Sequence, residues 1–175
     1  MREKSKSFVL WGKGLDHWEA GRLEEAAAEL QEAVALGVSD INFAQYLGSL
    51  GGVLGQLGKR VEAQAAFEHA LQRALDESEE EGNASSAVVS ARYSLAEHFL
   101  HFEQPLQAIA ISGPSVGVSA KLEGILRFIR AFAFAALGEG SRARTEALAA
   151  LELATSEDQR IRMKTQLEEI LRSAG

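Results

Sequence analysis

Two histidines and a glutamate stand close enough in the sequence to suggest a metal site. His98 and His101 are three residues apart, and Glu97 directly precedes His98. On a helix this spacing makes the imidazoles neighbours, so two nitrogens could approach one ion. A third ligand at usable spacing is missing, and the pattern is not HExxH. The spacing therefore favours solvated or groove-lining histidines over a metal centre.

Other patterns that could carry chemistry are also incomplete. Residues 48–55 read Gly-Ser-Leu-Gly-Gly-Val-Leu-Gly, but no Lys-Ser/Thr pair follows and the leucines keep helical spacing, which favours close helix packing over a phosphate loop. The acidic run 76–81 lacks the alternating oxygen ligands and the central glycine of a calcium loop, which favours a solvated helix end. No serine, histidine and carboxylate set suggests a nucleophilic triad. We therefore expect no enzymatic activity, no metal and no cofactor.

Composition restricts the partners. The net charge is −7 and no dense basic run occurs, which argues against a nucleic-acid partner. No run of about 18 apolar residues is present, so we expect no membrane insertion. The absence of cysteine fits a reducing, cytoplasmic location. A chain of 175 residues suits one domain or a short repeat array.

The sequence favours helices throughout. Alanine and leucine dominate, β-branched residues are sparse, and only two prolines occur. Asp40 and Ser141 are predicted N-caps, and residues 156–159 read as a capping box that opens a final helix with an apolar stripe. A kink or short loop is expected over 112–117, where Pro114 removes a backbone donor. Helices are expected near 6–20, 22–36, 41–57, 60–79, 85–102, 105–112, 119–137, 141–154 and 156–173.

An internal repeat is the main signal. Gly14, Gly21, Ala26, Leu30 and Ala33 recur 37 residues later as Gly51, Gly58, Ala63, Phe67 and Ala70. Small residues such as Gly14 and Gly51 would let two helices of a hairpin approach closely, and Gly21, Gly58 and Gly138 stand where the first helix should end. The second helix then begins with an alanine and continues as one apolar stripe. The pattern predicts stacked helical hairpins.

This ladder resembles the tetratricopeptide repeat, in which antiparallel helix pairs stack into a superhelix. The resemblance implies an all-α solenoid in a single domain over 1–175, with repeats near 7–40, 44–78, 85–118 and 119–155 and a capping helix over 156–173. Lys13 and Arg130 depart from the pattern, because the family usually has an apolar residue there, and the closing proline of each repeat is missing.

The resemblance also implies a concave groove lined by the first helix of each repeat. The groove residues that it indicates are Phe8, Trp11, Leu15, Trp18, Gln45, Gly48, Gly52, Tyr93, Glu97, His101, Phe128 and Phe132. Aromatic residues dominate this set, and such residues are typical of binding hot spots. An alternative is that Trp11 and Trp18 fill the space above Gly48, Gly52 and Gly55. The Lys, Asn and Arg that grip a chaperone's carboxylate tail in some family members are absent from the matching positions.

Two functions follow from the resemblance. The first is an adaptor-like or chaperone-like module that binds a helix or peptide of another protein in the apolar groove. The alternative is a structural protein that forms homo-oligomers through the same aromatic face.

Overall fold

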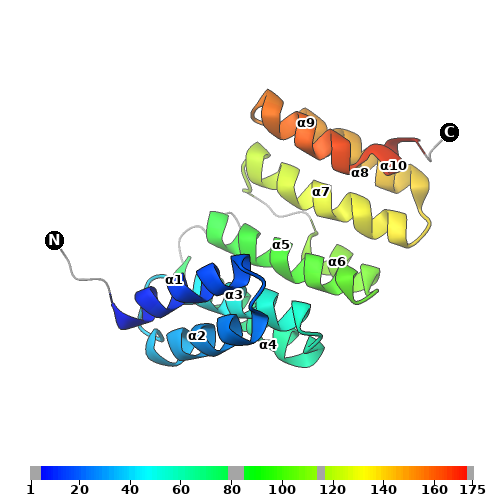
Figure 1. Ribbon diagram of the computed structural model, residues 1–175. Helices are drawn as coiled ribbons and strands as arrows, with labels where there is room; N and C mark the ends of the chain where they lie inside the picture. Colours follow the sequence, from blue (N-terminus) through cyan, green and yellow to red (C-terminus); the bar gives the residue numbers. More distant parts are fainter. Residues whose placement is uncertain (1–4, 79–84, 114–116, 173–175) are drawn as a thin grey trace. The chain divides into compact units, whose positions relative to one another are not determined.

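The computed structural model describes residues 5–78, 85–113 and 117–172, and in these ranges the only regular elements are α-helices (Figure 1). The predicted all-α fold is therefore confirmed. None of the helices within these ranges is long and apolar enough to cross a membrane. The helices are α1 Lys6–Glu19, α2 Leu23–Leu36, α3 Phe43–Gln56, α4 Arg60–Glu77, α5 Ser86–His101, α6 Pro105–Ile111, α7 Ala120–Ala136, α8 Gly140–Glu152, α9 Glu157–Gln166 and α10 Glu168–Arg172.

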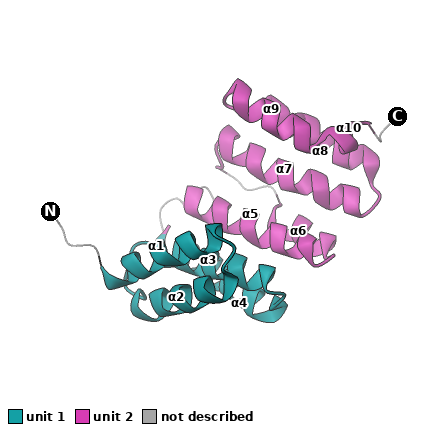
Figure 2. Cartoon of the chain, viewed as in Figure 1, with its two compact units in different colours: residues 1–77 teal, residues 78–175 magenta. Residues whose placement is uncertain are grey.

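The chain forms two compact units, residues 1–77 with α1 to α4 and residues 78–175 with α5 to α10 (Figure 2). We call them unit 1 and unit 2. Consecutive helices pack in pairs, α1 with α2 and α3 with α4 in unit 1, and α5 with α6 and α7 with α8 in unit 2. Each pair has the hairpin arrangement that the repeat pattern predicts. That the repeats act together as a single domain stays a prediction.

The turn inside three of the hairpins depends on glycine. Gly21, Gly58 and Gly138 have φ angles of 72°, 73° and 75°, in the left-handed region that a side chain disfavours. Each glycine lies two residues beyond the end of the first helix of its pair. The short connections force the following helix to run back along the first. These glycines therefore act as the sequence predicted.

Close approach of the paired helices also requires glycine. A Cβ added at Gly14 would lie 2.7 Å from Leu30 Cγ, and one added at Gly51 would lie 3.0 Å from the ring of Phe67. Leu30 and Phe67 come from the second helices of these hairpins. The repeated glycine thus makes room for the large apolar residue opposite it, as predicted.

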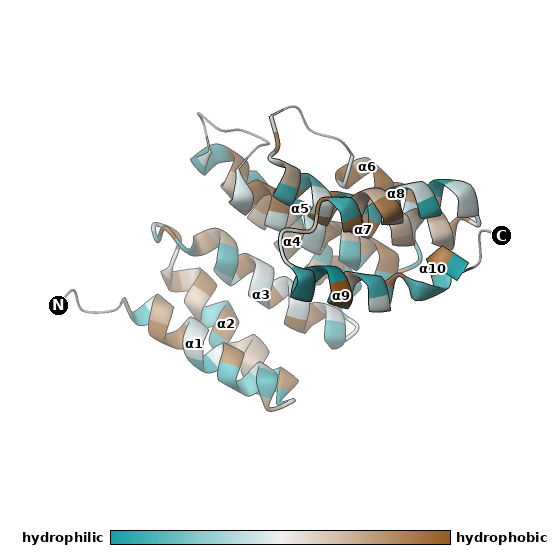
Figure 3. Ribbon diagram, turned by 90° about the horizontal axis from the view of Figure 1, so that it is seen from above, coloured by the Kyte–Doolittle hydropathy of each residue, from teal (hydrophilic) through white to brown (hydrophobic). Residues whose placement is uncertain are grey.

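The C-terminal helices complete the core of the last hairpin. Leu167 and Ile170 are buried in one cluster with Ala131, Phe134 and Ala147 of α7 and α8. Figure 3 shows α9, which precedes these two residues, as largely hydrophilic. The predicted capping helix exists, but it is interrupted at Leu167, and residue 173 lies outside the described ranges.

Two predicted N-caps are wrong, while a third is confirmed. Asn42 precedes α3, and the carboxylate of Asp40 instead accepts hydrogen bonds from other side chains. Ser141 is the second residue of α8, whose N-cap is Glu139. At α9 the Ser156 hydroxyl accepts from the backbone N–H of Gln159 at 3.2 Å, as the capping box requires.

The break expected near 112–117 begins where α6 ends at Ile111, and residues 114–116 lie outside the described ranges.

Buried arginines hold the end of α6. Arg92 of α5 donates through Nε to the carbonyl of Ile111 at 2.7 Å and also donates to the carbonyl of Gly113. Burial and the neighbouring charge of Arg130 lower the pKa of Arg92. These bonds satisfy carbonyls that a longer helix would have paired internally.

The contacts of Arg130 explain why an arginine stands where the repeat pattern has an apolar residue. It is buried in α7, and its guanidinium donates to Glu123 at 2.7 Å, to Glu146 at 3.2 Å and to the carbonyl of Ser112. A buried charge is tolerated only when it is paired and hydrogen-bonded. The arginine therefore joins α6, α7 and α8 in place of the apolar residue expected there.

Candidate functional site

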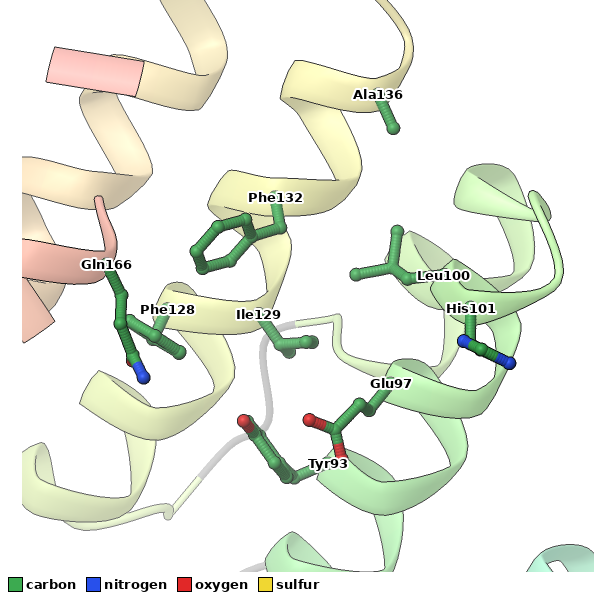
Figure 4. A pocket seen from close by; sticks show the side chains of 9 residues that line it. All are labelled: Tyr93, Glu97, Leu100, His101, Phe128, Ile129, Phe132, Ala136 and Gln166. Atoms are coloured by element: carbon green, nitrogen blue, oxygen red, sulfur yellow. The ribbon is translucent and has the colours of Figure 1, made fainter. Parts of the chain in front are cut away.

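An open hollow of about 640 Å³ lies in unit 2, between α5 and α7 (Figure 4). Its volume is in the range of about 300–1,000 Å³ that is usual for ligand sites. Most of its walls are apolar or aromatic, and α9 contributes one polar side chain. The lining residues are Tyr93, Glu97, Leu100, His101, Phe128, Ile129, Phe132, Ala136 and Gln166.

Helical spacing brings these side chains to one side of each helix. On α5, Tyr93, Glu97 and His101 are four residues apart, and on α7 Phe128 and Phe132 have the same spacing. Residues four apart lie above one another on a helix surface, so each helix presents a continuous strip to the hollow.

The two phenylalanines form part of the floor. Their ring centroids are 5.2 Å apart and the planes are inclined by 72°, an edge-to-face arrangement. Both rings also pack against the buried cluster of α7 and α8 and remain only partly exposed. They therefore present a rigid apolar surface, since their packing restricts the rotamers.

Two of the lining side chains are oxygen acids whose pKa is raised, Tyr93 and Glu97. Burial, together with the nearby charge of Glu97, raises the pKa of Tyr93 to about 12, so Tyr93 stays a neutral hydroxyl at physiological pH. Loss of hydration raises the pKa of Glu97, while the charge of His101 lowers it. Glu97 lies at the exposed rim of the hollow, so water still reaches its carboxylate.

A second hollow of about 270 Å³ shares Tyr93, Phe128 and Gln166 with the first. It continues toward α9, where Arg162 and Met163 contribute to its lining. The two hollows therefore adjoin along α7, and the combined surface has an acidic side chain in one part and a basic one in the other.

The two histidines of the possible metal motif have different environments. His98 is buried, and its ring lies 4.8 Å from that of Phe102. His101 is exposed at the edge of the hollow. Within the part of the chain that the structure describes, no three histidine, aspartate or glutamate side chains come together as metal ligands.

The tryptophans of unit 1 pack onto α3. Trp11 donates its indole N–H to Ser49 Oγ at 3.0 Å, and Trp18 donates to Gln56 Oε1 at 3.0 Å. A Cβ at Gly52 would lie 2.5 Å from Trp18 Cη2. The alternative interpretation, in which a large ring packs over a glycine, is therefore confirmed at Gly52. It is wrong for Gly48 and Gly55, where a Cβ would meet nothing within 4 Å.

The other groove residues predicted in unit 1 have simpler surroundings. The ring of Phe8 lies 5.4 Å from that of Trp11. Leu15 and Gly48 are partly exposed, and Gln45 is exposed. These residues lie on α1 and α3, which are neighbours in unit 1.

The structure thus brings five of the predicted groove residues to one hollow, namely Tyr93, Glu97, His101, Phe128 and Phe132. The prediction missed Ile129 and Ala136, although Ala136 continues the four-residue spacing from Phe132. It also missed Gln166, because nothing in the repeat pattern shows where the terminal helix packs.

Comparison with known proteins supports the architecture. No protein-family model matches the sequence, and no curated protein matches it. The structure is similar to a solved structure of MamA, the RS-1 ArsTM double mutant, with a TM-score of 0.61 and 15% sequence identity over 98% of each chain. MamA contains tetratricopeptide repeats, so the chain has a tetratricopeptide-like, all-α fold.

Proposed function

We propose that the protein binds a helix or an extended peptide of another protein in the hollow between α5 and α7. A tetratricopeptide-like fold implies protein–protein interaction. The observation that carries the more specific proposal is the open hollow itself, because aromatic side chains with restricted rotamers surround it. Such side chains provide most of the binding free energy at protein interfaces.

The shape of the surface supports a peptide as the occupant. The second hollow extends the first past Tyr93 and Phe128, so the apolar surface is elongated. An amphipathic helix could place its apolar face on such a surface with its polar face in water. The protein would then act as an adaptor or chaperone-like module in the cytoplasm, without catalysing a reaction.

In unit 1 we propose that the predicted groove residues of α1 and α3 form a second contact surface for a partner. The indole N–H groups of Trp11 and Trp18 are already used by α3, so only the exposed parts of these rings would contact a partner. Beside them, a Cβ at Gly48 would meet nothing within 4 Å, which leaves space for a partner side chain.

The proposal can be tested with a variant whose added side chain fills the hollow while every core side chain is kept. Ala136 is exposed and lines the hollow, so Ala136→Phe should occupy the space that a partner needs. Ala120→Phe makes the same change at an exposed position of the same helix that does not line the hollow. The wild type and Ala120→Phe should capture the same proteins from lysate. Ala136→Phe should no longer capture these proteins.

Two outcomes would contradict this proposal. Identical captured proteins for all three versions would show that binding does not use the hollow. A dimer in sedimentation experiments that dissociates on Ala136→Phe would instead favour the homo-oligomeric alternative. Melting temperatures of the three versions should agree, which checks that Ala136→Phe leaves the fold intact.

A further inference from the structure

Glu97 is the acidic side chain of the hollow, and it has no ion-pair partner among the described residues. By contrast, Glu123 of α7 and Glu146 of α8 form ion pairs with Arg127 and Arg130. In Figure 4 the Glu97 carboxylate points into the space between α5 and α7, toward Tyr93. The protein thus places an acceptor for a cation in an aromatic surrounding.

The basic groups nearby form no ion pair with this carboxylate among the described residues, although the charge of His101 lowers its pKa. His101 lies one turn further along α5, but its ring packs edge-on against Phe102, with centroids 4.8 Å apart and planes at 83°. Figure 4 shows the imidazole turned away from the hollow. Arg162 lines only the adjoining hollow, and within the described ranges it forms no ion pair with Glu97. Tyr93 is the remaining titratable group in the lining, and it is neutral.

The aromatic walls add a second attraction for a cation. The faces of phenylalanine and tyrosine rings are electronegative, so a cation near a ring face is stabilised, and more strongly where water is excluded. Tyr93, Phe128 and Phe132 all line the same space as Glu97. An apolar stem with a charged end, as in lysine or arginine, matches both features.

We infer that the hollow binds a lysine or arginine side chain of the partner peptide, with Glu97 as its counter-ion and the aromatic rings around its aliphatic stem. This inference rests on the proposed function. An acidic or purely apolar side chain fits less well, because it would leave the Glu97 carboxylate repelled or partly dehydrated without a partner.

The state of Glu97 agrees with such a ligand. Loss of hydration raises the pKa of Glu97. A bound cation would favour the ionised carboxylate and lower this pKa again. The site is therefore partly dehydrated before the ligand arrives, which strengthens its attraction for an opposite charge.

The experiment uses a random peptide library displayed on phage and selected on the immobilised full chain. Peptides selected on the wild type should contain lysine or arginine among apolar residues. A synthetic copy with norleucine in place of that lysine, or of the corresponding arginine, should bind the wild type about tenfold more weakly. The same replacement should weaken binding to Glu97→Gln only about threefold, because the counter-ion is gone and only the attraction of the rings for a cation remains.

Glu152→Gln is the matched control, since Glu152 is exposed on α8 and does not line the hollow. It should keep the full preference for a basic residue. Peptides that Ala136→Phe blocks but that show no basic preference, or an acidic one, would overturn the inference and leave the proposed function intact. Selected peptides that Ala136→Phe does not affect would count against the proposed function itself.

Discussion

Arg130 offers a sharp test of what holds unit 2 together, because the same two glutamates also contact a more exposed arginine. The Arg130 side chain is 5% exposed and contacts Glu123 at 2.7 Å and Glu146 at 3.2 Å, besides the carbonyl of Ser112. Arg130→Met removes all three interactions while keeping an unbranched apolar stem. Leaving a buried carbonyl unpaired costs about 1–3 kcal/mol, and removing one member of a buried ion pair costs about 3–5 kcal/mol in total.

Arg127→Met is the matched control. Arg127 lies one turn earlier on α7 and contacts Glu123 at 3.2 Å and Glu146 at 3.3 Å, but its side chain is 32% exposed. Water screens such a pair, so its removal should lower the free energy of unfolding by less than about 1 kcal/mol. The two variants remove the same charge from the same helix, and they differ in burial and in the hydrogen bond that Arg130 donates to the buried carbonyl of Ser112.

Urea unfolding followed by far-UV circular dichroism measures both variants. Trp11 and Trp18 lie in unit 1, so tryptophan fluorescence in the same titration follows unit 1 alone. The loss should be about 3–5 kcal/mol for Arg130→Met. Adding Glu146→Gln should recover part of it by removing a carboxylate whose remaining partner is the more exposed Arg127. Equal costs for the two arginine variants would refute the assignment of burial as the cause.

Three further changes test other parts of the structure. Gly52→Ala should lower the free energy of unfolding by about 1–3 kcal/mol, because the added Cβ would lie 2.5 Å from Trp18 Cη2. Gly48→Ala should raise it by about 0.5–1 kcal/mol, because the added Cβ meets nothing within 4 Å. The midpoints of urea unfolding compare the two variants. Gly138→Ala should cost about 1–2 kcal/mol in the same assay, since its φ is 75°. The hydrogen bond from Ser7 lowers the pKa of Asp40 below 3.8, so this carboxylate contributes fully above about pH 4 and less as the pH falls through its lower folded pKa. The stability difference between wild type and Asp40→Asn should therefore shrink from pH 7 to pH 2, and an equal difference at both would contradict this.

The hairpins could be predicted because their signals are local. Glycine two residues beyond a helix is required by a positive φ at the turn, and Gly14 and Gly51 are required by the large residue that packs against each. Such requirements act within one repeat, so they recur at a fixed spacing in the sequence. The resemblance to the tetratricopeptide repeat, carried over to the matching positions, indicated Tyr93, Glu97 and Phe128 as groove residues on their respective helices.

Polar residues inside the repeats were harder to interpret. The sequence identified Arg130 as a departure from the pattern, but its partners Glu123, Glu146 and Ser112 lie on three different elements. The sequence predicts Asp40 as an N-cap, yet its carboxylate accepts hydrogen bonds from Ser5 and Tyr46 instead. A polar side chain can form hydrogen bonds of similar free energy with several different partners. Only the packed structure shows which partner lies within hydrogen-bonding distance.

The sequence alone determined that the chain forms helical hairpins, where they turn, and which helix faces are aromatic, because helix spacing and glycine conformation are properties of neighbouring residues. Tertiary packing decided that Trp18 covers Gly52, that Gln166 of the terminal helix reaches the hollow, and that Glu97 lies in the hollow without an ion-pair partner among the described residues. These contacts join residues from separate elements, so they depend on how the helices pack against one another.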